Sequence, residues 1–166
     1  MLALPRQHKR KYIFMSYEHI ENLYRPEARK ILLFKEVWAL EKIHGTSARV
    51  RWKDGQITFS SGGEKHERFV AFFNEEELQA KFTELGHDGV IIYGEAYGGK
   101  CQGMSETYGK ELRFIAFEVQ IGDTWLNVEN AAEVVQKLGL EFVHYVKIPT
   151  TIEAIDEQRD APSVQA

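Results

Sequence analysis

The chain has 166 residues, of which 43% are hydrophobic, and its formal net charge is −4. This size suits one hydrophobic core, and the acidic balance excludes a strong non-specific polyanion binder, which would usually be basic. The single cysteine, Cys101, excludes an internal disulfide, and no Cys/His spacing indicates a zinc site. We therefore expect a cytoplasmic, intracellular protein with no membrane span or signal peptide, and a bacterial or phage-like origin stays open.

Two segments precede the first expected strand. Residues 1–12 carry a run of basic side chains, which predicts a flexible basic tail, with a phosphate-contacting arm as the alternative. Residues 17–34 are expected to be partly helical and to be interrupted at Pro26. The buried face of that helix would consist of four apolar residues: Ile20, Leu23, Ile31 and Leu32.

A strand pair is predicted next. The apolar run at residues 37–40 indicates one strand, and the alternation of residues 47–52 indicates a second, half-buried one. Asp54-Gly55 is a strong hairpin signal and predicts a return strand over residues 57–60. Loops are then expected over two ranges, residues 61–63 and residues 64–68.

The rest of the chain mixes helices and strands. Helices are predicted from capping residues at Asn74 to Gly86, at Asn127 to Leu138 and near residues 151–159, the last with a capping box made by Thr150 and Glu153. Strands are predicted at residues 90–93, 113–121, 124–126 and 141–146, and a polar loop at residues 100–112. The absence of regular β-α-β alternation favours a single α+β domain built on antiparallel strands.

Lys42 is the candidate nucleophile. The pattern Lys-x-x-Gly occurs twice, at Lys42 and at Lys100, which is about the frequency expected by chance. Only Lys42 lies between two apolar strands, where partial burial beside other cations could lower the pKa of the amine and keep it neutral for attack. The alternative is an ordinary lysine at a strand end, whose stem carries the charge to solvent.

Two further residue types could contact a ligand. Glu95 ends the apolar strand at residues 90–93 and is followed by small residues, so that its carboxylate could reach the hydroxyls of a ligand. Phe114 or Phe117 could stack on a base. Each has a plain alternative: a solvated glutamate at a strand end, and ordinary core packing of a phenylalanine.

Three segments together resemble a known family. Residues 41–46, Glu-Lys-Ile-His-Gly-Thr, resemble motif I of the covalent nucleotidyltransferases, which include ATP- and NAD-dependent ligases and mRNA capping enzymes. Residues 92–95 are similar to motif III, and residues 113–119 to the following motif, in which a phenylalanine stacks on adenine. His44 stands where RNA ligases of the RNA ligase 2-like type have histidine. The resemblance implies an adenylyltransferase domain of an ATP-dependent RNA ligase, with a partial ligase and ATP-grasp-like core and antiparallel sheets around a nucleotide cleft.

The resemblance also implies roles for individual residues. Lys42 would attack the α-phosphorus of ATP, expel pyrophosphate and hold AMP as a phosphoramidate. Glu95 would hold the ribose hydroxyls, and Phe117 would stack on adenine. Magnesium would neutralise the phosphates while needing few protein ligands, none of which is identified.

Residues next to the lysine would have supporting roles. Glu41 would accept a hydrogen bond from the adenine amino group, Gly45 would bring backbone close to the nucleotide, and His44 would assist near the phosphates. With Lys42, Glu95 and Phe117, these residues complete the candidate site.

The sequence also departs from the family. The basic residue that commonly follows the first hairpin is missing, unless Lys65 or Arg68 supplies it. Neither the Glu-Gly strand that serves the metal nor the Lys-x-Lys strand that grips the phosphate follows residue 128, so we expect a truncated or shortened relative with impaired activity.

The predicted function is to form lysyl-AMP, pass AMP to an RNA 5′-phosphate and seal that end to a 3′-hydroxyl, with ATP and RNA ends or nicked duplex RNA as partners. The alternatives are a non-catalytic nucleotide- or RNA-binding module, a DNA ligase-like adenylyltransferase, and a fragment whose cleft is too incomplete to bind anything.

Overall fold

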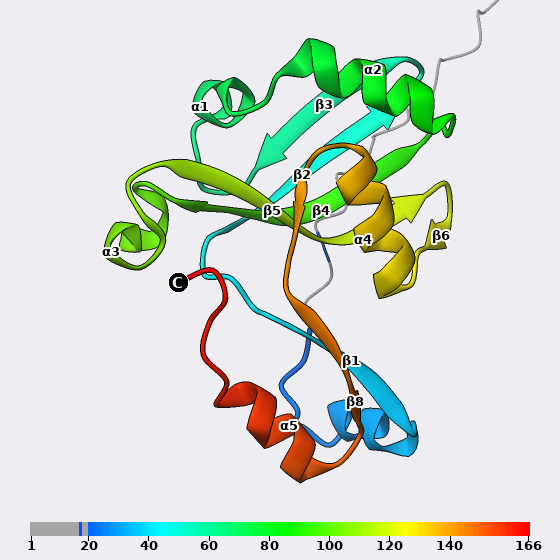
Figure 1. The fold of residues 1–166 in the computed structure, drawn as a ribbon, viewed down its shortest axis with the longest axis vertical. Coiled ribbons are helices and arrows are strands. Elements are labelled where there is room, and N and C mark those ends of the chain that lie inside the picture. The colour runs from blue at the N-terminus through cyan, green and yellow to red at the C-terminus, as the bar shows by residue number, and fades with distance from the viewer. Residues whose placement is uncertain (1–16, 18–19) are drawn as a thin grey trace, which may run out of the picture.

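The computed structural model describes Tyr17 and residues 20–166 and contains two sheets (Figure 1). The smaller sheet pairs β1 (Glu36–Leu40) with β8 (Tyr145–Pro149) in antiparallel fashion. The larger sheet has six strands in the order β3-β2-β4-β5-β6, with β7 paired to β5. Its strands are β2 (Thr46–Lys53), β3 (Gln56–Ser61), β4 (Val90–Gly98), β5 (Leu112–Ile121), β6 (Thr124–Trp125) and β7 (Glu141–Phe142).

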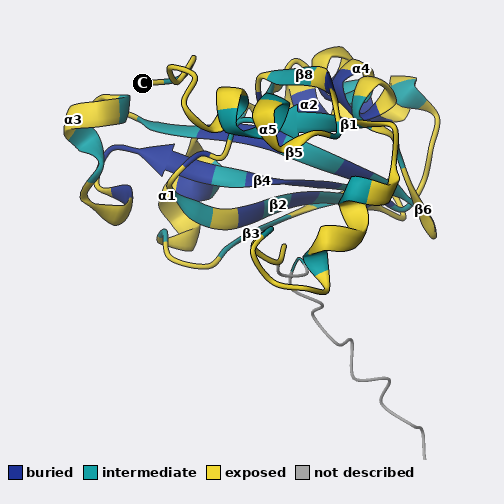
Figure 2. Cartoon of the chain, turned by 90° about the horizontal axis from the view of Figure 1, so that it is seen from below, coloured by how far each residue is buried: buried dark blue, intermediate teal, exposed yellow. Residues whose placement is uncertain are grey.

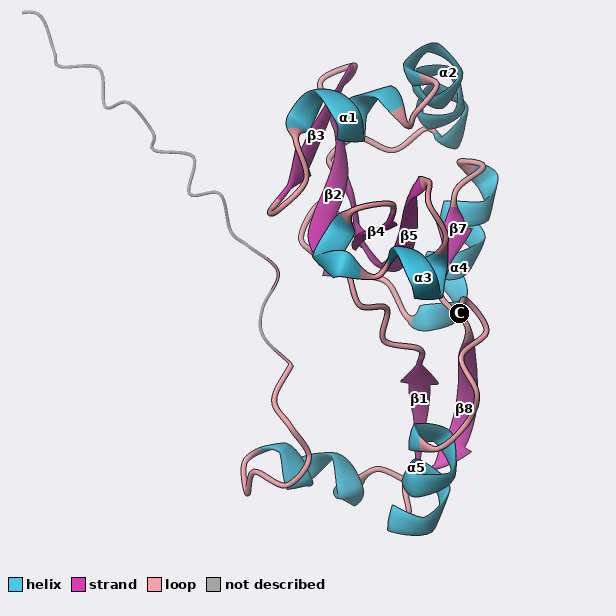
Figure 3. Cartoon of the chain, turned by 90° about the vertical axis from the view of Figure 1, so that its left-hand side faces the viewer, coloured by secondary structure: helices cyan, strands magenta, loops and turns pink. Residues whose placement is uncertain are grey.

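The helices divide between the two sheets, as the secondary-structure view in Figure 3 shows. Helices α1 (His66–Ala71), α2 (Glu75–Leu85) and α4 (Val128–Lys137) accompany the larger sheet, and η2 (Cys101–Gly103) and α3 (Ser105–Tyr108) follow β4. Helix α5 (Ile152–Arg159) lies beside the smaller sheet, and η1 (Ala28–Leu33) precedes β1 in the chain. Among the described residues, no helix is long and apolar enough to span a membrane.

The main core fills one face of the larger sheet. Side chains from α1, α2 and α4 pack against alternate residues of the strands, among them Val50, Ile92 and Phe114. Trp52 stacks on Phe82 of α2, with ring centroids 5.5 Å apart. The middle strand β4 is almost entirely buried (Figure 2). Three helices cover this face, and we call the opposite face, which carries Tyr93 and Glu95, the open face.

Local signals in the sequence predicted several of these elements. Asp54 and Gly55 both have positive φ, 51° and 72°, which is the backbone of a tight hairpin turn. Asn74 accepts a hydrogen bond from the backbone N–H of Glu77 (3.2 Å) and begins α2. Asn127 caps α4 in the same way, at 2.9 Å from the backbone nitrogen of Asn130. The predicted α+β class with antiparallel sheets is confirmed, although β7 pairs with β5 in parallel.

Two predictions about the start of the chain need separate treatment. The basic tail at residues 1–12 lies outside the described residues. The segment predicted to be partly helical over residues 17–34 contains, in its described part, a 3-10 helix that begins after Pro26, over Ala28–Leu33. None of the four residues of its predicted buried face is fully buried: Ile20 is 74% exposed and Ile31 40% exposed, while Leu23 and Leu32 are half-buried.

Other predicted boundaries are also corrected. The expected charged loop at residues 64–68 contains the start of α1, and the loop at residues 100–112 contains η2 and α3. The single strand predicted at residues 141–146 is two strands in different sheets, β7 and β8. The cap of α5 is Thr151, whose hydroxyl accepts from the N–H of Ala154, while the hydroxyl of Thr150 is buried.

Candidate active site

Lys42 lies where the chain passes from the smaller sheet to the larger one. The strand β1 ends at Leu40 and β2 begins at Thr46, and these two strands belong to different sheets. Ile43 anchors the crossing because its side chain is 2% exposed and packs in a small cluster with Tyr97 and Ile115. Lys42 and His44, on either side of Ile43, are both exposed. The predicted position between two strands is confirmed, but the predicted partial burial of Lys42 is wrong.

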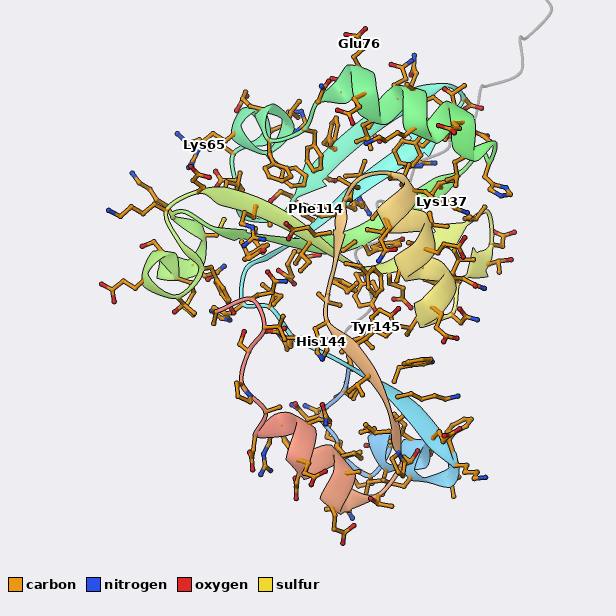
Figure 4. All side chains as sticks on the ribbon, viewed as in Figure 1. Lys65, Glu76, Phe114, Lys137, His144 and Tyr145 are labelled. Atoms are coloured by element: carbon orange, nitrogen blue, oxygen red, sulfur yellow. The ribbon has the colours of Figure 1, made fainter. Side chains whose placement is uncertain are left out.

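The segment between β1 and β2 is hydrogen-bonded to the segment between β7 and β8, which also connects the two sheets. The N–H of Glu41 donates to the carbonyl of His144 at 2.9 Å, where the chain returns from β7 to β8. Figure 4 shows His144 and Tyr145 at this junction. The backbone next to Lys42 is therefore held in place by the segment that connects β7 to β8.

Gly45 is required by a close approach of two backbones. A Cβ added at this position would collide with the carbonyl of Ala96 and lie 3.0 Å from the Cβ of Tyr97. Both partners belong to β4. Glycine therefore lets the lysine loop lie directly against β4, which brings Lys42 to the part of that strand that carries Glu95.

Glu95 lies inside β4, so its predicted position at a strand end is wrong. It is opposite Ser47 of β2 on one side and Ile115 of β5 on the other, on the open face of the sheet. Its Oε2 atom is buried and has no hydrogen-bond partner among the described residues. Burial raises the pKa of Glu95, and the nearby positive charge of Lys42 lowers it, with burial the larger effect. A buried carboxylate oxygen without a donor, close to a lysine, is suited to accept from the hydroxyls of a ligand.

Phe117 and Phe114 point to opposite faces of β5. The register of β4 and β5 shifts between Tyr93 and Gly94, and Phe117 is the extra residue of this bulge. Its ring contacts Tyr17 edge-on, with centroids 4.9 Å apart. Phe114 is 2% exposed and packs with aromatic side chains of the main core (Figure 4). The bulge therefore places Phe117, and not Phe114, on the open face with Glu95.

Three more aromatic rings extend this face, and the sequence reasoning missed them. Tyr17 contacts Tyr93 at 5.4 Å between centroids, and Tyr93 contacts Trp125 at 5.2 Å. Burial raises the pKa of Tyr93. The period-two pattern of Tyr93, Glu95 and Tyr97 in the sequence is the signal that could have placed Tyr93 beside Glu95.

The Glu41 carboxylate is already hydrogen-bonded by the segment Ser163–Gln165. The hydroxyl of Ser163 donates to it, and the N–H of Val164 lies 3.2 Å and that of Gln165 3.4 Å from its Oε1 atom. The hydroxyl of Tyr97 also lies 3.0 Å from Oε1 of Gln165. A ligand that donates to Glu41 would have to displace these donors.

His44 faces a different neighbour. Its backbone N–H donates to the hydroxyl of Tyr108 in α3, at 3.3 Å. The side chain of His44 is exposed and lies in the same loop as Lys42. Its imidazole is thus available to a ligand that reaches Lys42.

Within Tyr17 and residues 20–166, no group of three or more His, Cys, Asp or Glu side chains could hold a metal ion. Mg²⁺ bound through phosphate oxygens and waters needs few protein ligands, which fits such a surface. No protein ligand of Mg²⁺ is identified among the described residues.

Comparison with protein families gives one match. The RNA ligase family matches residues 35–165, which include the lysine loop, β4, β5 and the segment that contacts Glu41. No curated protein sequence matches the chain at a significant level.

Solved structures with a similar fold are of Naegleria gruberi RNA ligase. A mutant with AMP and Mn superposes with a TM-score of 0.67 at 16% identity, over 82% of this chain and 44% of that chain. A second mutant, with ATP and Mn, has a TM-score of 0.63 at 18% identity, over 79% and 42% of the two chains. The form with PPi has a TM-score of 0.65 at 18% identity, over 79% and 43%. The fold is shared, and this chain spans less than half the length of those chains.

Proposed function

Because this chain belongs to the RNA ligase family, we propose that it is the adenylyltransferase part of an ATP-dependent RNA ligase. The observation that carries the proposal is the grouping of Lys42, Glu95 and Phe117. The charge of Lys42 acts on Glu95, whose Oε2 atom is buried, and the bulge of β5 turns the ring of Phe117 to the same face. An amine, a hydroxyl acceptor and an aromatic ring are the three groups that a nucleotide phosphate, ribose and base would need.

The proposed reaction has three steps. The Lys42 amine, having lost its proton, attacks the α-phosphorus of ATP; the P–N bond forms as the bond to pyrophosphate breaks. An oxygen of an RNA 5′-phosphate then attacks the same phosphorus and releases the lysine. Finally a 3′-hydroxyl attacks the 5′-phosphate, loses its proton and releases AMP. Each step is a displacement at phosphorus, in which alignment and charge neutralisation do most of the catalysis.

Each residue has one part in this proposal. Glu95 accepts from the ribose hydroxyls, and Phe117 stacks on adenine. Glu41 accepts from the adenine amino group after Ser163–Gln165 has moved, and the imidazole of His44 neutralises phosphate charge. Gly45 keeps the loop against β4.

Magnesium is the metal that we propose, bound through the phosphates of ATP, where it would neutralise their charge. The neighbouring ligase structures contain Mn together with ATP or AMP. The identity of the metal can be tested by measuring adduct formation with either ion.

Intact mass after incubation with ATP and magnesium tests the proposal. The proposal predicts an increase by one AMP that is lost in Lys42→Ala and kept in Lys100→Ala. Lys100 is a matched control because it begins the second Lys-x-x-Gly pattern and is exposed. Saturable ATP binding without an adduct would instead indicate a non-catalytic nucleotide-binding module.

A further inference from the structure

A short excursion of the chain between β4 and β5 is hydrogen-bonded to the lysine loop, residues 41–45. The excursion contains η2 and α3, and its two ends meet because the N–H of Gly99 donates to the carbonyl of Gly109 at 2.9 Å. At the end of α3, the hydroxyl of Tyr108 accepts a hydrogen bond from the backbone N–H of His44 at 3.3 Å. These two residues are 64 positions apart, so the bond joins the lysine loop to a separate part of the chain.

The ring of Tyr108 is held in place by its own packing. It lies edge-on to the ring of Tyr97, with centroids 5.4 Å apart, and Tyr97 is fully buried. Tyr97 belongs to the small cluster that contains Ile43, and Tyr108 packs against this cluster. The ring of Tyr108 therefore rests on the same cluster that anchors the lysine loop, and its hydroxyl bonds the residue after Ile43.

A second contact fixes the excursion near its start. Cys101 is 6% exposed, and its thiol lies 3.4 Å from the Oε2 atom of Glu64. Burial raises the pKa of the Cys101 thiol to about 11, so the thiol keeps its proton at neutral pH and can donate to the carboxylate. Glu64 also accepts from Arg68 of α1 at 3.3 Å. The excursion is thus tied down on both sides of the helix that carries Tyr108, which gives the hydroxyl a defined position.

The side chain of Lys42, in contrast, has no partner that orients it. It is exposed, and within the described part of the chain it makes no hydrogen bond or ion pair. The direction of the amine therefore depends on the backbone on either side. Before Lys42, the N–H of Glu41 donates to the carbonyl of His144, and after it the N–H of His44 donates to Tyr108. Because displacement at phosphorus needs the attacking atom in line with the leaving group, a small shift of this backbone would slow the attack.

We propose that Tyr108 is a positioning residue for the nucleophile: its hydroxyl fixes the backbone at His44, and this bond aligns the Lys42 amine with the α-phosphorus of ATP. The inference rests on the proposed function, because that function gives Lys42 its reaction. Tyr108 acts through the loop and contacts neither the nucleotide nor the transferred proton. Its hydroxyl should therefore affect the rate of lysyl-AMP formation and leave the affinity for ATP unchanged.

Single-turnover formation of lysyl-AMP, followed by intact mass at increasing ATP concentration, tests this role. For each variant it gives the limiting rate and, separately, the ATP concentration at half of that rate. Tyr108→Phe is the principal variant, because it keeps the ring and removes only the hydroxyl. Thr107→Val is the matched control, because it removes the hydroxyl of an exposed neighbour in the same helix. Thermal melting monitored by circular dichroism checks that each variant is folded.

Hydrogen exchange of the His44 backbone N–H, measured by NMR, reports on the same bond without requiring catalysis. In Tyr108→Phe this N–H should exchange roughly 2- to 12-fold faster, which is the range for one ordinary hydrogen bond. The limiting rate of lysyl-AMP formation should fall by roughly 5- to 50-fold, while the ATP concentration at half of that rate should change by less than about twofold. Thr107→Val should match the wild type in both measurements.

The proposal is overturned if Tyr108→Phe forms the adduct at the wild-type rate, or if Thr107→Val slows it equally. It is also overturned if ATP affinity or melting temperature falls together with the rate, because Tyr108 would then support the fold instead of aligning Lys42. A wild-type chain that forms no lysyl-AMP would contradict the proposed function, and hydrogen exchange then decides alone. Faster exchange of the His44 N–H in Tyr108→Phe would keep Tyr108 as the anchor of the loop, and unchanged exchange would overturn it.

Discussion

Replacing Glu95 with glutamine should make the protein more stable and less able to bind ATP. The Oε2 atom of Glu95 is buried without a hydrogen-bond partner among the described residues, and burial raises the pKa of this carboxyl more than Lys42 lowers it. In the folded protein the charged form of this carboxyl is therefore disfavoured relative to the unfolded chain. Glutamine has the same shape and no charge, so it resembles the protonated glutamate.

The sign of the pH dependence follows from the raised pKa. The folded state binds the proton of Glu95 more tightly than the unfolded state does, so the free energy of unfolding falls as pH rises from the ordinary range of a glutamate to the raised pKa. Glu95→Gln removes this decrease in the free energy of unfolding. We expect a gain of roughly 0.5–2 kcal/mol at pH 7, typical of relieving one unfavourable site. The gain should disappear below a pH of roughly 4, where glutamate is protonated in both states.

Glu95→Gln should weaken ATP binding although it stabilises the protein. A hydrogen bond to a charged acceptor contributes roughly 1.5–3 kcal/mol, so Glu95→Gln should weaken ATP binding by roughly 10- to 150-fold. Thermal melting between pH 4 and 8 and calorimetric titration with ATP would measure both effects. Glu118→Gln is the matched control, because Glu118 is a half-buried glutamate that faces Tyr93 on the same side of the sheet. A Glu95→Gln variant that melts lower at neutral pH and binds ATP unchanged would refute this reasoning.

Four further substitutions test other parts of the site. Gly45→Ala should reduce both stability and adduct formation, because its Cβ would collide with the backbone of β4; equal melting temperatures for the variant and the wild type would contradict that packing. Phe114→Ala should cost roughly 3–5 kcal/mol in the free energy of unfolding, measured in urea, as a deletion in the core does. Phe117→Ala should destabilise the protein less than Phe114→Ala does and should weaken ATP binding more. If Phe114→Ala weakened ATP binding more, the assignment of Phe117 as the stacking ring would be wrong. Ser163→Ala should strengthen ATP binding by a few-fold in calorimetry, since it removes one donor that competes for Glu41, and weaker binding would show that Ser163 supports the nucleotide instead.

The sequence predicted those parts of the fold that depend on local chemistry. The caps at Asn74 and Asn127 and the turn at Asp54-Gly55 were correct because each uses hydrogen bonds or backbone angles within a few residues. The membership in the RNA ligase family, predicted from residues 41–46, 92–95 and 113–119, is also confirmed. Short motifs of adjacent residues identify the family even when the tertiary structure is not known.

Features that depend on contacts between distant residues could not be predicted. The region from Glu141 to Val146 divides between two sheets because β7 pairs with β5 and β8 with β1, a choice that no local pattern states. The bond between Glu41 and Ser163 joins residues 122 positions apart. Lys42 was expected to be partly buried because apolar strands flank it, yet the buried residue of that loop is its neighbour Ile43.

The row formed by Ser60, Arg49 and Tyr93 across three strands shows the same limit. Arg49 and Ser60 are recognisable in the sequence as residues of one hairpin, and their pairing follows from the turn at Asp54-Gly55. The addition of Tyr93 from β4 requires the order of the strands in the sheet.

The most direct test of the account is the intact mass of the chain after incubation with ATP and a divalent metal. The account predicts one added AMP, bound through the amine of Lys42, absent from Lys42→Ala and present in Lys100→Ala. A chain that gains no AMP, or that gains it equally in Lys42→Ala, would contradict the assignment of Lys42 as the nucleophile.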